Sequence, residues 1–121
     1  MRVLVADDSR LMRKVISRAL DALGVTDVCE AVDGVEAIEA FGRGKFDLVL
    51  TDWNMPDKTG LEVLKEIRGQ GSNVPVIMIT TESDERRIKE AIQAGVTDYL
   101  AKPFDTSKIR EKLQKYISIA T

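Results

Sequence analysis

The stretch LVLTDWNMP, residues 48–56, decides the fold of this chain. Apolar residues lead into Asp52, and Met55-Pro56 closes a turn directly afterwards. An apolar run bounded by turn residues indicates a strand buried on both faces, as in a parallel sheet. Asp52 would then lie at the carboxyl end of that strand, where open α/β sheets place their ligand crevice. Taken alone, such a carboxylate is more often a turn former or a helix cap.

Strand and helix patterns alternate on both sides of this stretch. Short β-prone or apolar runs predict further strands at residues 2–6, 76–80 and 98–101, and a weaker one at 28–31. A charge inside the weaker run places it at a sheet edge. Apolar residues at helical spacing follow each strand, at residues 12–23, 35–41, 61–67, 88–92 and 109–117. The expected caps of the later helices are Asp33, Thr59, Ser83 and either Asp105 or Thr106.

This alternation predicts one α/β domain over residues 1–121, a doubly wound sheet of five parallel strands flanked by five helices, with no output domain. The carboxyl ends of parallel strands share one rim of the sheet. Polar residues stand at four of the predicted strand ends, namely Asp7-Asp8, Asp52, Thr80 and Lys102. These polar residues are far apart in the sequence, but we expect them to lie close together in the folded protein.

Composition limits the function classes. The formal net charge of -2 gives no reason to expect binding to nucleic acid or membranes, and no apolar run could cross a bilayer. The single Cys29 cannot form an internal disulfide, which favours a reducing cytoplasm. Histidine is absent. A catalytic histidine, a histidine-bound metal and a phosphohistidine donor are therefore excluded.

The predicted rim carries an excess of negative charge. Two unit charges about 4 Å apart repel by about 4 kcal/mol at an effective dielectric constant near 20. A divalent cation would compensate, and oxygen ligands without histidine or cysteine suit Mg²⁺. Mg²⁺ leaves room for a phosphoryl oxygen, so Asp52 is interpreted as the nucleophile of an aspartyl phosphate. Lys102 would supply positive charge, and the Thr80 hydroxyl a hydrogen bond.

Each of these residues also has a purely structural explanation. Asp7-Asp8 would cap the first helix, Thr80 would cap the fourth, and Lys102 would be a surface lysine. Other chemistries fit worse, because the first strand–helix turn has no glycine for a dinucleotide or P-loop site. A Ser-His-Asp arrangement is impossible without histidine.

Taken together, these residues resemble the response-regulator receiver domain family over essentially the whole chain. The matching elements are Asp7-Asp8, residues 51–56, Gly60, Thr80 and residues 102–104. The resemblance implies the strand order 2-1-3-4-5 and Asp52 as the phosphorylated residue. It also implies Asp7, Asp8 and the Asn54 backbone carbonyl as Mg²⁺ ligands, and a cis peptide between Lys102 and Pro103.

Within the family, the sequence is most similar to the single-domain chemotaxis (CheY-like) members. That similarity implies a monomeric signalling switch, whose only catalysis is its own phosphorylation and dephosphorylation. Its partners would be a CheA-like sensor histidine kinase, a flagellar motor switch protein and a phosphatase. Thr80 and an exposed Tyr99 that swings inward would form the switch, and partners would dock on Ile88, Tyr99 and Lys112. The alternative is a phosphorelay carrier that passes its phosphoryl group to a histidine phosphotransfer protein.

Overall fold

A computed structural model describes residues 1–81 and 85–120. Within these residues, five strands form one parallel sheet in the order β2-β1-β3-β4-β5. The strands are β1 (Arg2–Ala6), β2 (Asp27–Ala31), β3 (Leu48–Thr51), β4 (Val76–Thr80) and β5 (Asp98–Ala101). The predicted fold class and strand order are confirmed, and β2 is an edge strand as its internal charge indicated.

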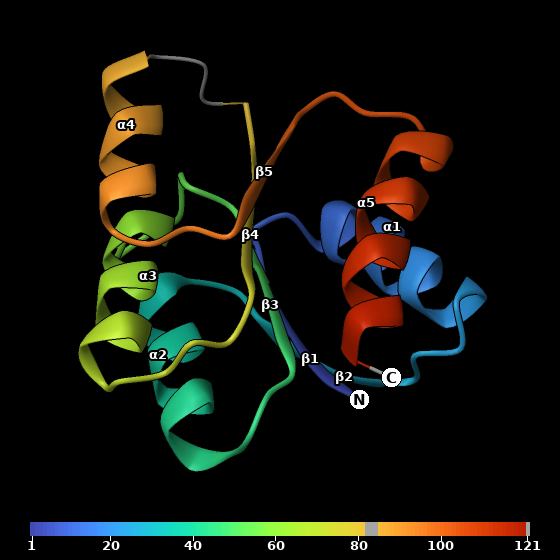
Figure 1. Ribbon diagram of the computed structural model, residues 1–121, viewed down its shortest axis with the longest axis horizontal. Coiled ribbons are helices and arrows are strands. Elements are labelled where there is room, and N and C mark those ends of the chain that lie inside the picture. Colours follow the sequence, from blue (N-terminus) through green and yellow to red (C-terminus); the bar gives the residue numbers. More distant parts are fainter. Residues whose placement is uncertain (82–84, 121) are drawn as a thin grey trace.

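The helices of the described residues lie in two layers, one on each face of the sheet (Figure 1). They are α1 (Arg10–Ala22), α2 (Gly34–Arg43), α3 (Gly60–Gly69), α4 (Glu85–Gln93) and α5 (Thr106–Ala120). Helices α1 and α5 cover one face, and α2, α3 and α4 cover the other. Both termini lie at the rim where the strands begin, opposite the rim where they end.

The central strand explains why its sequence is apolar without alternation. Leu48 and Leu50 of β3 belong to the hydrophobic cluster under α1 and α5, whereas Val49 belongs to the cluster under the other three helices. All three side chains are fully buried. A strand covered on both faces must be apolar at every position, and this property places Asp52 directly beyond a rigid core element.

Side chains cap most of the helices. Ser9 accepts a hydrogen bond from the Met12 N–H at 3.2 Å and caps α1. Asp33 caps α2, and Thr59 forms a complete capping box with Glu62 at the start of α3. Asp105, rather than Thr106, receives the Lys108 N–H at 2.8 Å before α5. The expected cap Ser83 lies outside the described residues.

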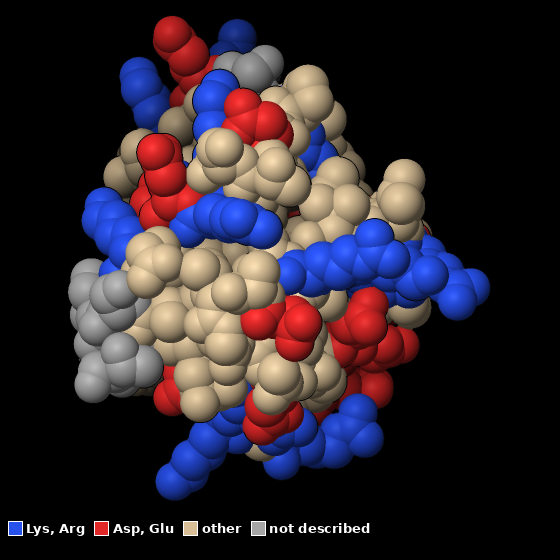
Figure 2. Space-filling model, turned by 90° about the vertical axis from the view of Figure 1, so that its right-hand side faces the viewer, with Lys and Arg blue, Asp and Glu red and all other residues tan. Residues whose placement is uncertain are grey.

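The face formed by α1 and α5 carries basic and acidic side chains in close alternation (Figure 2). Neighbouring charges of opposite sign weaken the field over this face. Across the described part of the chain, no helix is both long enough and apolar enough to span a membrane.

Candidate functional site

The carboxyl ends of the strands bring the predicted site residues to one rim of the sheet. Asp7 directly follows β1, Asp52 directly follows β3, Thr80 ends β4 and Lys102 directly follows β5. The Asp52 N–H donates to the Ala6 carbonyl at 2.9 Å, and the Lys102 N–H donates to the Thr80 carbonyl at 2.9 Å. These backbone bonds extend the strand pairing beyond the strands themselves, so the side chains start from fixed positions.

Asp7, Asp8 and Asp52 form a carboxylate cluster. Each offers one oxygen, and these oxygens all lie within 4.8 Å of one another. Asp7 and Asp52 are buried, whereas Asp8 is exposed. The cluster therefore has one open side that solvent, a cation or a phosphoryl donor can approach.

Lys102 bridges the two buried carboxylates. Its Nζ lies 2.8 Å from Asp7 Oδ2 and 3.2 Å from Asp52 Oδ2, and its side chain is only 13% exposed. Burial alone would lower the pKa of Lys102. The hydrogen bonds to Asp7 and Asp52 and the charges of both outweigh burial, and the pKa rises above its ordinary value. Lys102 is therefore a persistent ammonium ion, and a single positive charge leaves the cluster of three carboxylates negative.

Backbone amides fix the remaining oxygens of the buried carboxylates. Asp52 Oδ1 accepts the Trp53 N–H at 2.7 Å, and Asp7 Oδ1 accepts the Ser9 N–H at 2.8 Å. Each carboxylate is thus held at one oxygen by the backbone and at the other by Lys102. This arrangement orients the Asp52 carboxylate before any ligand arrives.

Arg13 supports the cluster from α1, a role that was not predicted from the sequence. Its Nη1 donates to the Asp7 carbonyl at 2.8 Å, and its Nε pairs with Glu30 of β2 at 3.0 Å. Only the position of Arg13, one turn beyond Ser9, could have suggested it. The partners of Arg13 could not be predicted, because they depend on how β1 and β2 lie relative to α1 in the folded protein.

The structural explanations for these residues do not hold. Ser9 caps α1, so Asp7 and Asp8 are not needed there. Thr80 is the last residue of β4, and the described part of α4 starts at Glu85, five residues later. Lys102 is not a surface lysine, because its side chain is almost buried between two acids.

Residues 3–114 match the response regulator receiver domain family. This chain belongs to that family. The receiver domain is 43% identical to the Vibrio cholerae chemotaxis protein CheY-3 over 117 residues, which cover 95% of this chain and 90% of that protein. It is 41% identical to the Pseudomonas aeruginosa chemotaxis protein CheY, covering 95% and 94% of the two chains.

Solved structures give the same result for the fold. The Vibrio cholerae chemotaxis response regulator CheY4 superposes with a TM-score of 0.87 at 35% identity, covering 95% of this chain and 97% of that one. A Francisella response-regulator receiver domain gives a TM-score of 0.88 at 30% identity, covering 99% and 98%. The receiver family predicted from the sequence is therefore confirmed, and the Lys102–Pro103 peptide is cis, as the resemblance implied.

The two predicted switch residues of the receiver domain are both at least partly buried. Thr80 is fully buried. The expectation of an exposed Tyr99 is wrong, because the residue is half-buried and its hydroxyl oxygen is buried. The ring packs against the hydrophobic cluster under α2, α3 and α4, which removes its apolar surface from water. Ile88 of α4 is half-buried, and Asn54 is exposed in the turn after β3.

The predicted partner residue Lys112 belongs to a small polar cluster between β5 and α5. Its Nζ lies 3.0 Å from Asp98 Oδ1, and the Tyr116 hydroxyl donates to Asp98 Oδ2 at 2.6 Å. Burial raises the pKa of Asp98, but its hydrogen bonds and the Lys112 charge lower it further, to below the ordinary value. Burial and the nearby Asp98 carboxylate raise the pKa of Tyr116 to about 12. A partner that uses Lys112 must therefore compete with Asp98 for its ammonium group.

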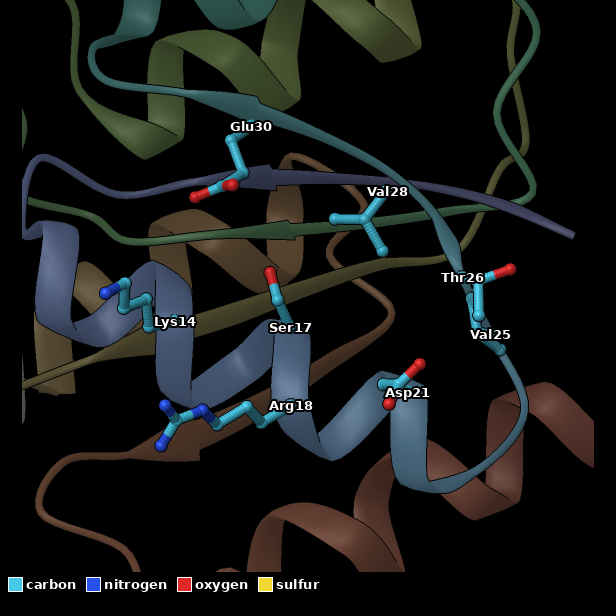
Figure 3. Close-up of a pocket in the computed structure, with 8 residues that line it drawn as sticks. All are labelled: Lys14, Ser17, Arg18, Asp21, Val25, Thr26, Val28 and Glu30. Carbon is cyan, nitrogen blue, oxygen red and sulfur yellow. The ribbon is translucent and has the colours of Figure 1, made fainter.

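A pocket of about 370 Å³ lies between α1 and β2, away from this site (Figure 3). Lys14, Arg18, Asp21 and Glu30 surround it, over Val25 and Val28. The predicted site residues do not line it. The residues that the sequence predicted to carry the chemistry lie at the acidic rim and not at this pocket.

Proposed function

We propose that this receiver domain is a phosphorylation-controlled switch of a chemotaxis pathway, with Asp52 as the residue that accepts the phosphoryl group. The observation that carries the proposal is the bridge that Lys102 makes between Asp7 and Asp52, beside the exposed Asp8. The relatives named as chemotaxis proteins support the pathway. A CheA-like histidine kinase would be the donor, and the protein would act as a cytoplasmic monomer, with a phosphatase as a further partner.

The residues of the rim have separate tasks in this proposal. Asp52 is the nucleophile, oriented at Oδ1 by the Trp53 N–H. Lys102 Nζ lies 3.2 Å from Asp52 Oδ2 and would form an ion pair with the phosphoryl oxygens after transfer. The Thr80 hydroxyl, at the end of the neighbouring strand, would donate to one of them. Phosphoryl transfer needs mainly such positioning and charge neutralisation.

The donor set of the cluster fits Mg²⁺, because all its side-chain ligands are carboxylate oxygens and one side of the cluster is open. Asp7, Asp8, Asp52 and the Asn54 backbone carbonyl would hold the ion. When bound, Mg²⁺ would neutralise charge on the phosphoryl oxygens.

We expect Mg²⁺ to change the fluorescence of Trp53 in a saturable manner, and the substitution Asp8→Ala to weaken that response severely. Trp53 is the single tryptophan, it is 4% exposed, and its amide contacts the Asp52 carboxylate. A matched control is Asp57→Asn, which removes an exposed negative charge outside the cluster and keeps a side chain that tolerates the left-handed backbone of Asp57 (φ 68°). Equal titration curves for Asp8→Ala and wild type would mean that the acidic pair does not bind the metal.

We expect Lys102→Ala to lower the free energy of unfolding by about 2–3 kcal/mol in EDTA, because two buried carboxylates lose their shared cation. Millimolar Mg²⁺ should restore most of this loss, since a divalent cation can replace the missing charge. Urea unfolding with and without Mg²⁺ measures both effects. Lys58→Ala is the control, because Lys58 is half-exposed and its ion-pair partner among the described residues is the half-exposed Glu62, at 3.7 Å. An unchanged stability of Lys102→Ala in EDTA would contradict the proposed electrostatics.

The signal would leave through the face that contains Ile88, Tyr99 and Lys112. Phosphorylation adds charge and acceptor oxygens beside Thr80, the last residue of β4. Thr80 of β4 pairs with Ala101 of β5, and Tyr99 lies on β5, two residues before Ala101. A shift of the Thr80 side chain would therefore change the space available to Tyr99, and with it the shape that a partner meets.

Binding to a flagellar motor switch protein tests this function. Allosteric coupling of about 1–3 kcal/mol predicts that beryllofluoride, a stable phosphoryl mimic, tightens binding about 5- to 150-fold. Equal affinity with and without the mimic, together with rapid loss of phosphate to a histidine phosphotransfer protein, would instead establish a relay carrier.

A further inference from the structure

Arg87 of α4 contacts the residue that follows Asp52. Its guanidinium carbon lies 5.9 Å from the centroid of the Trp53 ring. A guanidinium within about 6 Å of an indole face is attracted by the quadrupole of the ring. The Trp53 ring is almost fully buried, and the Trp53 N–H donates to Asp52 Oδ1 at 2.7 Å. A side chain of α4 is thus separated from Asp52 by a single residue.

Few apolar side chains anchor α4 to the rest of the protein. Among its described residues Glu85–Gln93, only Ala91 is buried. Ile88 is half-buried, and Ile92 is 62% exposed. The stability of a helix in a protein comes mostly from packing of its apolar face. The contact between Arg87 and Trp53 is therefore one of the interactions that position the first turns of α4.

We propose that Arg87 is a positioning residue that couples α4 to the state of Asp52 through Trp53. This inference rests on the proposed function, because it requires Asp52 to carry the phosphoryl group. Phosphorylation adds negative charge beside the Trp53 amide. That charge changes the electrostatic field at the indole and attracts the Arg87 guanidinium that lies over it. The position of α4 changes as a result. Ile88, the next residue of α4, carries the response to the proposed partner face.

The coupling must act in both directions. A partner that holds α4 in one position changes the affinity of Asp52 for a phosphoryl mimic by the same factor that the mimic changes partner affinity. Removing the contact should weaken this coupling while Asp52 keeps its other contacts, Lys102 Nζ and the Trp53 N–H. Beryllofluoride should accordingly still bind an Arg87→Met protein, with an affinity within about fivefold of wild type, as expected for a partly exposed cation–π contact.

Hydrogen–deuterium exchange of residues 85–93, with and without beryllofluoride and Mg²⁺, tests the proposal. Fluorine NMR of the bound beryllofluoride shows independently whether the site is occupied. We expect the mimic to change exchange in wild type. In Arg87→Met this change should fall below half, and in Arg87→Lys, which keeps a cation, it should partly recover. Lys89→Met removes an exposed cation of the same helix and should behave as wild type.

Different results would contradict the phosphorylation of Asp52 and the positioning role of Arg87. If wild type binds no beryllofluoride, the proposed phosphorylation of Asp52 is wrong, and the role of Arg87 is wrong with it. If beryllofluoride binds but exchange in residues 85–93 does not change in wild type, Arg87 does not couple α4 to Asp52. An equal change in wild type and Arg87→Met leads to the same conclusion. In the last two cases the proposed phosphorylation stands.

Discussion

Replacing Asp52 with asparagine is expected to abolish phosphorylation by acetyl phosphate in the presence of Mg²⁺. A carboxylate oxygen can attack phosphorus and form an acyl phosphate, whereas a carboxamide is not a nucleophile of comparable strength. The substitution preserves size, and the new amide oxygen can still accept the Trp53 N–H that Asp52 Oδ1 accepts at 2.7 Å. The loss should therefore reflect chemistry rather than a disturbed fold.

Intact mass spectrometry measures the result directly. Wild type should gain the mass of one phosphoryl group with Mg²⁺ and none in EDTA, and Asp52→Asn should gain none in either. Asp57→Asn is the matched control, because Asp57 is an exposed acid in the same β3–α3 connection. It should be phosphorylated as wild type is. An Asp52→Asn protein that still gains a phosphoryl group would transfer the nucleophile role to another residue.

Gly60→Ala is expected to be strongly destabilising, lowering the free energy of unfolding by about 4 kcal/mol or more. A Cβ at this position would lie 2.0 Å from the Asp52 carbonyl oxygen and 2.9 Å from Met78 Sδ. The Gly60 N–H also donates to the Trp53 carbonyl at 2.8 Å, which holds the start of α3 under the end of β3. The Asp52 backbone on one side and the fully buried Met78 side chain on the other leave little room for relaxation, so the clash displaces Asp52.

Gly42→Ala provides the control within the same chain. Gly42 lies in α2, and a Cβ there meets nothing within 4 Å. Alanine at an open helical position should stabilise by up to about 1 kcal/mol. Urea unfolding of both variants should therefore give shifts of opposite sign. Similar stabilities for the two variants would show that the close approach at Gly60 is relieved without cost.

The fold could be predicted because a short run of consecutive apolar residues identifies its central strand. Leu48, Val49 and Leu50 could be read as a strand buried on two faces, and the structure assigns them to the two hydrophobic clusters. The grouping of the site residues at one rim could be predicted from the topology alone. Once the strands are parallel, residues at their carboxyl ends must meet, and Asp7 and Asp52 do so through Lys102.

What could not be predicted depends on distances between elements. The acidic pair was a plausible cap for α1, and only the position of the helix start shows that Ser9 caps it instead. Tyr99 was expected to be exposed as part of the switch that the family resemblance implies, but its ring packs against the cluster under α2, α3 and α4. The contact between Arg87 and Trp53 joins residues from different elements, and no spacing in the sequence indicates it.

The most direct test of the central claim is to identify the phosphorylated residue chemically. Borohydride reduces an aspartyl phosphate to homoserine, which marks the modified position permanently in a peptide. After treatment with acetyl phosphate and Mg²⁺, peptide mass spectrometry should find homoserine at position 52, and the sample prepared in EDTA should contain none. Homoserine at Asp7, Asp8 or any other acid, with aspartate unchanged at position 52, would contradict the assignment of Asp52 as the phosphoryl acceptor.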